Sequence, residues 1–405
     1  MYTTNASIDW TKRKVLDQNK LDAVNKGRSN IFNWKGQFTP DFISYIIQMY
    51  ANPGDVIADP FSGSGTVLIE SLQMGHSCVG FEINPSAYFM SSFFKYANLT
   101  VEERNALYDK ILSYITPIAR AINKEDMVYK ESPTFRESYK SLLELSSLIA
   151  QTADKSYIPF LINVLFLCEK DKSMTLIDAF RKNFSRMRIH FYLLPYSSST
   201  VNVHLSDAKN IGKQYDSCID LIITSPPYIN VFNYHQNYRG IVEAFGFNVL
   251  KVASSEIGSN RKNRSNRFKT VVQYSEDMGV VLFEAIRSLK VGGTIIAVVG
   301  RESMVRKTRF YNSRIIVDLV GCIPSAEITS IETRHFFNRY GEDIKEDIIF
   351  IRKIAPTSLC CAEKFKDVGI RHIEQAIDYA QGELRNDLIS VIKEQQTIYE
   401  SPIFL

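Results

Sequence analysis

Four consecutive residues, Ser225-Pro226-Pro227-Tyr228, have the most specific chemistry in the sequence. They follow an apolar run, Asp220–Thr224, that is typical of a buried strand, and the two prolines end it because they fix φ and lack an amide N–H. The Ser225 hydroxyl and the free Pro226 carbonyl can both accept hydrogen bonds, which suits an amino group with two N–H bonds. Tyr228 offers a flat face on which a planar base can stack. The alternative is a strand that ends at proline, followed by a tyrosine that only packs.

A glycine-rich turn is the second candidate site. It has the sequence Asp59-Pro60-Phe61-Ser62-Gly63-Ser64-Gly65-Thr66 and lies between a predicted strand, Asp55–Ala58, and a predicted helix, Thr66–Met74. Glycines allow the backbone to approach a ligand closely, and the amides at the start of a helix attract an anionic group. The turn lacks the Lys-Ser/Thr pair of a P-loop and the third glycine of the dinucleotide fingerprint, which disfavours both of those sites.

Glu82 ends the next predicted strand, Cys78–Glu82, within Phe81-Glu82-Ile83-Asn84-Pro85. A carboxylate at this position can accept hydrogen bonds from both hydroxyls of a ribose. Together with the turn, it predicts a site for a nucleoside that carries a small anionic group. The alternative interpretation is a tight packing turn beside a solvated glutamate.

These motifs together resemble those of the DNA amino-methyltransferases, which act on N4 of cytosine or N6 of adenine. In that family an Asp/Ser/Asn-Pro-Pro-Tyr/Phe motif holds the target amine, and an Asp-Pro-Phe-x-Gly-x-Gly-Thr motif binds S-adenosyl-L-methionine. Both motifs occur here, at 225–228 and 59–66. A third motif, near the methionine part of the cofactor, is similar to Lys35-Gly36-Gln37-Phe38-Thr39-Pro40. The resemblance covers 33–97 and 200–305, about half of the chain.

The resemblance implies a role for each motif residue. The expected catalytic residues are Ser225, Pro226, Pro227 and Tyr228. The expected contacts to S-adenosyl-L-methionine are Phe38, Thr39, Asp59, Pro60, Phe61, Ser62, Gly63, Gly65, Thr66, Glu82, Asn84 and Asp207. Asp207 is expected to contact the cofactor's adenine, and it is also a candidate helix N-cap, which is compatible with that role. No metal is implied.

Ser225, preceded by Thr224, is similar to the N4-cytosine branch of the family, because adenine enzymes more often carry Asp or Asn at that position. The implied reaction is a direct transfer of the methyl group to the exocyclic amine of a base that is flipped out of double-stranded DNA. Alignment of the reactants can contribute about 7–11 kcal/mol to such a step. Asn230, Asn233 and Tyr234 are expected near the base. A site-specific cytosine-N4 enzyme also implies a restriction–modification system, with a restriction endonuclease that acts on the same site.

Three alternatives remain open from the sequence. The first is an N6-adenine DNA methyltransferase. The second is an RNA methyltransferase, for example on a guanine amine, although such enzymes carry Asn/Asp-Pro-Pro-Tyr and often an added RNA-binding module that this sequence does not indicate. The third is a non-catalytic nucleic-acid-binding protein with the same fold, against which the intact motifs argue.

The elements around the motifs predict an α/β fold. A strand, turn, helix and strand over 55–82 form a βαβ unit, which predicts a parallel sheet whose ligands bind at the carboxyl ends of the strands. Further strands are predicted at Val201–Leu205, Asp220–Thr224, Thr294–Val299 and, as a hairpin at the sheet edge, Ala326–Glu332 and Asp347–Arg352. Further helices are predicted at Asp41–Tyr50, at Ser275–Leu289 and from Ala362 onward. The resemblance implies a Rossmann-like methyltransferase fold with a mostly parallel seven-stranded sheet.

The region from 98 to about 190 has helical periodicity and is too long for a crossover, which predicts a helical insertion. The expected division is a loosely packed N-terminal arm and cofactor half at 1–97, the insertion at 98–195, a catalytic half at 196–355 and a helical tail at 356–405. The insertion is a candidate for target recognition because Phe180–His190 is basic and aromatic. An ordinary amphipathic helix is the alternative.

A second candidate for contact with nucleic acid is Asn260–Lys269, which carries five positive charges in ten residues. They are Arg261, Lys262, Arg264, Arg267 and Lys269. The segment has no apolar periodicity, which predicts an exposed loop suited to phosphate contacts that weaken with salt. A solvated basic loop is the alternative.

The composition is that of a globular protein, with 405 residues, 45% hydrophobic and 23% charged. The net charge of +4 permits a nucleic-acid partner without demonstrating one. The six cysteines form no Cys-x-x-Cys pair and no zinc-like spacing. No secretory leader is evident, and the longest apolar stretch, Tyr157–Cys168, is too short to cross a bilayer. We therefore expect a protein of the reducing cytoplasm with no membrane partner.

Overall fold

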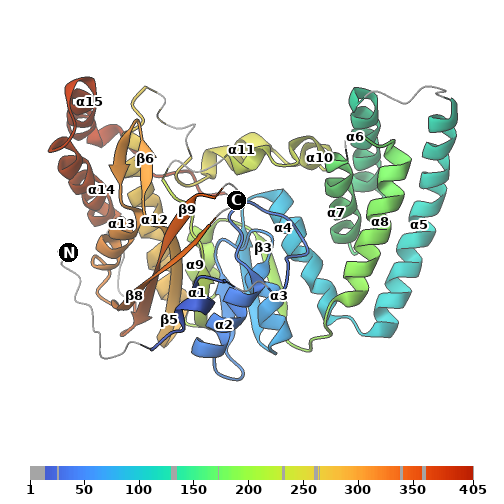
Figure 1. The fold of residues 1–405 in the computed structure, drawn as a ribbon, viewed down its shortest axis with the longest axis horizontal. Helices are drawn as coiled ribbons and strands as arrows, with labels where there is room; N and C mark the ends of the chain where they lie inside the picture. The colour runs from blue at the N-terminus through green and yellow to red at the C-terminus, as the bar shows by residue number, and fades with distance from the viewer. Residues whose placement is uncertain are drawn as a thin grey trace.

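The computed structural model describes residues 14–24, 27–128, 135–171, 173–229, 233–259, 263, 265–337, 341–357 and 362–404. At its centre is a seven-stranded sheet with helices on both faces (Figure 1). The strands are β1 (Val56–Asp59), β2 (Ser77–Glu82), β3 (Val201–Leu205), β4 (Ile219–Thr224), β5 (Leu289–Gly300), β8 (Ala326–Phe337) and β9 (Asp343–Lys353).

The strand order is β3-β2-β1-β4-β5-β9-β8. Strands β1 to β5 pair in parallel, and β9 is antiparallel to both of its neighbours, β5 and β8. The mostly parallel seven-stranded sheet and the edge hairpin are therefore confirmed. The order reverses between β1 and β4, and such a switch point opens a crevice at the carboxyl ends of the strands. Asp59, Glu82 and Thr224 end their strands at this edge of the sheet.

Alternating apolar residues give the central strands two buried faces. One face is covered by α2 (Pro40–Tyr50), whose Phe42 and Ile46 share a core with Leu221 and Ile223 of β4. The intervening Ile222 belongs to a second core on the opposite face, which includes α12 (Lys269–Ser288), α13 (Asn312–Val320) and α14 (Ala362–Ile377). Burial on both faces accounts for the continuous apolar run in β4.

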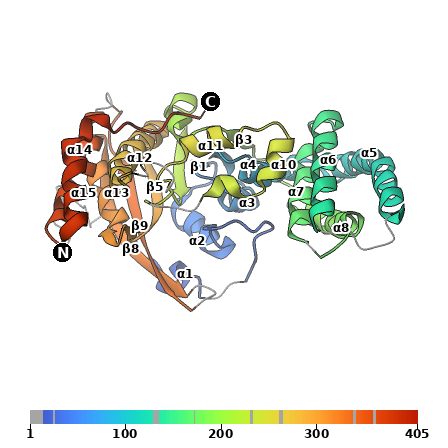
Figure 2. The ribbon, with the colours of Figure 1, turned by 90° about the horizontal axis from the view of Figure 1, so that it is seen from above.

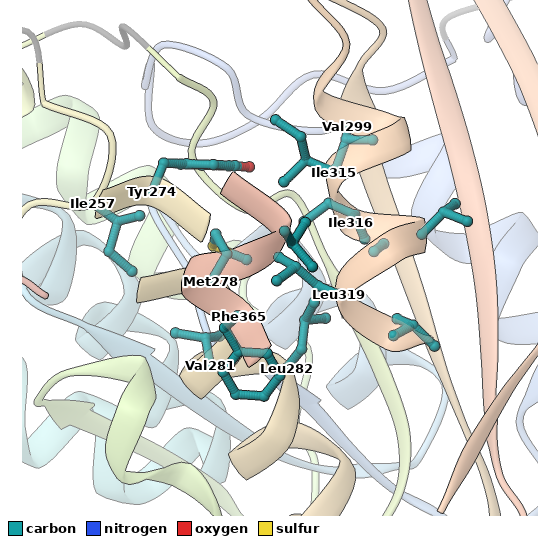
Figure 3. Packing of buried hydrophobic residues seen from close by; sticks show 14 of the residues in the cluster. Ile257, Tyr274, Met278, Val281, Leu282, Val299, Ile315, Ile316, Leu319 and Phe365 are labelled. Atoms are coloured by element: carbon teal, nitrogen blue, oxygen red, sulfur yellow. The ribbon is translucent and has the colours of Figure 1, made fainter. Parts of the chain in front are cut away.

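Helix α12 packs against both α13 and α14. Figure 3 shows Phe365 of α14 beside Val281 and Leu282 of α12. A Cβ atom at Gly279 of α12 would come 2.2 Å from the Phe365 ring, so this glycine lets α12 and α14 pack closely. The C-terminal helical tail, which continues with α15 (Gly382–Lys393), is therefore an integral layer of the fold.

The predicted helical insertion is a bundle to one side of the sheet (Figure 1 and Figure 2). It consists of α5 (Val101–Val128), α6 (Phe135–Thr152), α7 (Ile158–Lys170) and α8 (Leu176–Leu193). Phe160 of α7 and Phe191 of α8 share one core with Phe93, which follows α4 (Pro85–Ser92), and with Leu68 of α3 (Thr66–Gln73). The bundle is thus anchored to the helices that follow β1 and β2.

Most residues of the N-terminal arm over 14–24 are exposed, but Leu21 of α1 (Gln18–Leu21) is 1% exposed and the Asp22 carboxylate accepts a hydrogen bond from the His335 amide at 2.8 Å. One local prediction was wrong. Helix α12 begins at Lys269, six residues before the predicted start at Ser275. A second sheet, β6 (Ser303–Val305) with β7 (Thr308–Phe310), and two short helices, α10 (Arg239–Ala244) and α11 (Val249–Ser255), were not predicted.

Within the described ranges, none of the helices combines the length and the apolar composition that crossing a membrane requires.

Candidate functional site

A cavity of about 380 Å³ lies at the carboxyl ends of β1 to β4. Its walls come from segments that are far apart in the sequence: 34–38, 59–64, 66–67, 82–84, 207–208, 225–229, 234, 255–257, Ser303 and Glu346. The switch point of the sheet therefore brings the glycine-rich turn and the Ser-Pro-Pro-Tyr corner into one site.

The structure brings together most of the predicted site residues. All four residues of 225–228 line the cavity, and so do all the predicted cofactor contacts except Thr39 and Gly65. Thr39 precedes α2 at its N-cap position. Gly65 has a φ of 87°, and a Cβ atom there would come 2.8 Å from the Phe94 ring and 2.9 Å from Ser91. Gly65 therefore allows the turn to pack closely against Phe94 and Ser91, and it does not line the cavity.

Asp59 connects the two halves of the site. Its Oδ1 accepts hydrogen bonds from the Thr224 hydroxyl at 2.6 Å and from the Phe61 amide at 3.0 Å. Burial raises the pKa of Asp59 to about 7, although both hydrogen bonds act to lower it. Because Thr224 immediately precedes Ser225, this bond fixes the end of β4 to the end of β1.

Glu82 accepts hydrogen bonds from the backbone of the glycine-rich turn and from its own strand end. Its Oε2 accepts from the Gly63 amide at 2.9 Å, and its Oε1 accepts from the Asn84 amide at 2.8 Å. Burial raises the pKa of Glu82 to about 7, and the two amides oppose that shift. Each carboxylate oxygen has a second lone pair, so Glu82 can also accept hydrogen bonds from hydroxyl groups of a ligand.

Asp207 follows β3 and holds two backbone segments. Its Oδ1 accepts from the Lys209 amide at 2.9 Å, which confirms the N-cap interpretation, and its Oδ2 accepts from the Phe404 amide at 3.2 Å. The chain near Phe404 is fixed by Lys209, whose fully buried Nζ donates to Asp277 at 2.6 Å and to the Ser401 carbonyl at 3.0 Å. The C-terminal segment thus lies against a wall of the cavity.

Glu82 and Asp207, the carboxylates that follow two neighbouring strands, share the lining of the cavity with the apolar Ile83. This set of acceptors and apolar surface fits a nucleoside. Ser62 Oγ and Asn84 Nδ2 have no hydrogen-bond partner among the described residues, and both atoms are fully buried. The described part of the chain holds no group of three or more His, Cys, Asp or Glu side chains placed to bind a metal.

The Ser-Pro-Pro-Tyr corner also contacts the antiparallel part of the sheet. The half-buried Tyr228 donates its hydroxyl to Glu346 Oε1 of β9 at 3.1 Å, and a Cβ atom at Gly300 would come 2.8 Å from the Tyr228 ring. Burial raises the pKa of the Tyr228 phenol, the Glu346 carboxylate adds to that shift, and the Ser225 side chain opposes it. Glu346 was not predicted from the sequence.

A second unpredicted acid, Glu256, lines the cavity with 6% of its surface exposed. Its carboxylate accepts from the His235 amide at 2.8 Å and is paired with His235 Nδ1 at 2.7 Å. Tyr234, expected near the base, also lines the cavity and stacks on Trp34 with ring centroids 5.8 Å apart. Asn233 is not among the lining residues, and Asn230 lies outside the described residues.

The basic segment differs from the predicted exposed loop. Arg261, Lys262 and Arg264 lie outside the described residues. Arg267 is half-buried, and Lys269 is the first residue of α12, where its Nζ pairs with Glu394 at 2.5 Å. The intervening Phe268 is fully buried in the core. The expected contact of these basic residues with nucleic acid stays a prediction.

The raised pKa values of Glu82 and Asp59 predict that a ligand with donating hydroxyls binds more tightly as the pH rises through about 7. Protonation removes an acceptor, so affinity falls on the acid side. The effect on folding has the opposite sign. The pKa values of Glu82 and Asp59 in the folded protein exceed their ordinary values, so the folded state binds more protons than the unfolded state. The contribution of these two carboxyl groups to the free energy of unfolding therefore decreases as the pH rises from about 4 to about 7.

The binding half of this prediction is checked by calorimetry with S-adenosyl-L-methionine from about pH 6 to about 8.5. Glu82→Gln is the control, since the ligand's own amino group titrates identically with either protein. The prediction is wrong if both proteins show the same pH dependence.

Comparison with known proteins finds similarity in the N-terminal part of the chain. Residues 5–92 match a family model described as DNA methylase. The Type II methyltransferase M.MjaII of Methanocaldococcus jannaschii is 42% identical over 55 residues, which is 14% of this chain and 10% of that protein. The match therefore spans about a tenth of the relative's length.

Similar solved structures include a SAM-dependent methyltransferase from Methanosarcina mazei, with 13% identity and a TM-score of 0.35 over 76% of this chain and 97% of that one. An rRNA methylase from Streptococcus thermophilus has 7% identity and a TM-score of 0.30 over 78% of this chain and 94% of that one. These scores are too low to carry an argument, so the fold assignment depends on the strand order described above.

Proposed function

We propose, from the premise that residues 5–92 belong to the DNA amino-methyltransferase family, that this protein transfers a methyl group from S-adenosyl-L-methionine to the exocyclic amine of a base in double-stranded DNA. One observation carries the proposal: the Ser-Pro-Pro-Tyr corner and the carboxylates Glu82 and Asp207 line the same cavity at the switch point of the sheet. A site for an amine and a site for a nucleoside are thereby brought together.

The residues that would hold the cofactor follow from their chemistry. Glu82 would accept hydrogen bonds from ribose hydroxyls, and Asp207 would accept one from an adenine amine. Phe38 and the turn at 59–64 would surround the remainder. When bound, S-adenosyl-L-methionine would supply an electrophilic methyl group on a positively charged sulfur, which would keep the electron pair of the carbon–sulfur bond after the transfer.

The chain's own part in the chemistry is to hold the amine. Ser225 Oγ and the Pro226 carbonyl would accept its two N–H bonds, which favours a lone pair localised on nitrogen. That pair forms the new N–C bond, and one of the two protons leaves to solvent. Tyr228 would stack on the base, which must be flipped out of the duplex at a cost of a few kcal/mol. Alignment is then the main source of rate.

We further propose cytosine N4 as the acceptor atom. A serine at position 225 supports this choice, since the adenine branch more often carries Asp or Asn. A restriction endonuclease specific for the same site is the corresponding partner. DNA methylated by this protein should resist that endonuclease.

The test is to incubate the protein with labelled S-adenosyl-L-methionine and genomic DNA, digest the DNA to nucleosides and identify the product by mass spectrometry. N4-methylcytosine supports the full proposal. N6-methyladenine as the product supports the proposed transfer to an exocyclic amine and overturns the choice of cytosine. Transfer to RNA alone overturns the choice of DNA, and a protein that binds no cofactor would be a non-catalytic relative.

A further inference from the structure

A two-stranded hairpin begins at the edge of the cavity. Strand β6 pairs antiparallel with β7, and Ser303, the first residue of β6, lines the cavity. Asn312 holds this end of the hairpin, since its Nδ2 donates to Ser303 Oγ at 2.9 Å and to the Gly300 carbonyl at 3.0 Å. Asn312 Oδ1 also accepts from the amide of Ile229, which follows the Ser-Pro-Pro-Tyr corner, at 3.4 Å. The hairpin is therefore fixed beside the proposed catalytic corner.

The two faces of the hairpin differ in character. Val305 and Phe310 belong to the core around α12 and are 1% and 2% exposed. Met304 and Arg309 are cross-strand partners, and 47% of Met304 and 54% of the Arg309 side chain are exposed. Successive side chains of a strand point to opposite faces, so burial of Val305 and Phe310 fixes Met304 and Arg309 on the outer face.

The turn between the two strands consists of two cations. Arg306 and Lys307 have φ values of 47° and 66°, as in the type I′ turns that usually contain Asn-Gly. The Arg306 guanidinium pairs with Asp387 and Glu383 of α15. Lys307 is exposed and has no ion pair or hydrogen bond among the described residues. The turn thus uses one cation to hold the hairpin and presents the other to solvent.

The hairpin also packs on the basic segment at 260–269. The rings of Phe310 and Phe268 have centroids 6.1 Å apart, and the Arg306 guanidinium lies 5.8 Å from the centroid of the Phe268 ring. One acid opposes the positive charge of the outer face, because Glu302 pairs with Arg309 Nε at 3.1 Å. A guanidinium has five N–H donors, so this ion pair does not exhaust those of Arg309.

We propose that the outer face of the β6–β7 hairpin binds double-stranded DNA, with Lys307 and Arg309 in contact with phosphates beside the target base. The inference rests on the proposed function, because it names a part of the chain that holds the substrate of that reaction. A duplex whose base is flipped into the cavity must lie across the edge of the cavity, where the hairpin begins. A two-stranded ribbon fits the major groove, and cations on it neutralise phosphates.

The test compares DNA binding of the wild type with that of the double variant Lys307→Gln, Arg309→Gln. Phosphate contacts carry no sequence information, so a labelled duplex and fluorescence anisotropy suffice. At about 50 mM KCl the variant should bind roughly ten- to a hundredfold more weakly. Each phosphate contact contributes about −0.9 to the slope of log K against log salt, so the variant should lose about twelvefold less affinity than the wild type between about 50 and 200 mM. Its affinity for S-adenosyl-L-methionine should be unchanged.

Two single variants make the result specific to the hairpin. Lys290→Gln removes one charge at the amino end of β5, away from the cavity, where Nζ pairs with Asp220 at 2.8 Å. It should keep the wild-type slope, whereas Lys307→Gln should make the slope shallower by about 0.9. Lys307→Gly guards against a folding artefact, because glycine adopts a positive φ without strain. It should unfold at the wild-type temperature and bind DNA as Lys307→Gln does.

The outcomes separate the two proposals. If the wild type neither methylates nor binds the duplex, the proposed function fails, and this inference with it. If the wild type methylates DNA and the double variant keeps the wild-type affinity or the wild-type salt slope, the inference alone is overturned. A hairpin that serves a protein partner would give that second result.

Discussion

Replacing Ser225 with alanine should lower the single-turnover rate of methyl transfer about 10²–10³-fold, the size seen when one preorganised hydrogen-bonding group is removed from an active site. The substitution removes one of two acceptors and leaves the Pro226 carbonyl to hold the amine alone. The affinity for S-adenosyl-L-methionine should not change, because Ser225 belongs to the corner after β4, whereas Glu82, the proposed ribose acceptor, ends β2. Single-turnover kinetics and calorimetry measure the two quantities separately.

Ser198→Ala is a suitable control, since this exposed serine lies between α8 and β3. It should behave as the wild type in both measurements. Near-normal turnover of Ser225→Ala would refute the assignment of the corner as the catalytic site, whatever base is methylated.

Replacing Glu82 with glutamine should weaken the binding of S-adenosyl-L-methionine roughly ten- to a hundredfold, in the range for hydrogen bonds to a charged group. The carboxylate accepts two backbone amides and, in the proposed complex, ribose hydroxyls as well. The new NH₂ group must face either the Gly63 or the Asn84 amide, which is a donor opposite a donor. At saturating cofactor, kcat should be close to the wild-type value, because Glu82 holds the nucleoside and not the amine.

The comparison variant is Glu102→Gln, an exposed carboxylate in the first turn of α5. This substitution changes the net charge by the same amount as Glu82→Gln, and it should leave the affinity for S-adenosyl-L-methionine unchanged. An unaltered dissociation constant for Glu82→Gln would remove Glu82 from the proposed cofactor site.

Local signals at strand ends made most of the cavity predictable. A glycine-rich turn and a double proline each specify a backbone shape that few sequences adopt, and both follow an apolar strand. Once the βαβ unit predicts a parallel sheet, the carboxyl ends of its strands must meet at one edge. The positions of Asp59 and Glu82 followed from that rule, whereas Asp207 was expected from the resemblance to the DNA amino-methyltransferases.

Glu346 and Glu256 could not be predicted in the same way. Glu346 is one of several charged residues in an edge hairpin, and 118 positions separate it from the tyrosine that it contacts. Its place in the site depends on β9 pairing with β5, which the sequence of β9 does not specify. Glu256 ends a short helix, α11, that has no clear periodicity, and only its contact with His235 distinguishes it from a solvated acid.

The start of α12 was not predicted because the dense basic residues at 261–269 are typical of an exposed loop. Lys269 and its basic neighbours suggested a loop, whereas the buried Phe268 and Val271 begin an apolar face that continues into Val272. An ion pair with Glu394, far away in the sequence, accommodates the lysine. A positive charge at a helix start is therefore poor evidence for a free surface.

The amide of Phe404 and the proposed cofactor adenine depend on the same carboxylate, Asp207. Thermodynamic linkage then requires that docking of the C-terminal segment and occupancy of the cavity change each other's equilibrium constants by the same factor. Saturation with cofactor should slow protease cleavage between η5 (Gln395–Thr397) and Phe404. A fusion partner attached just beyond this segment would, conversely, act as a remote modulator of cofactor affinity.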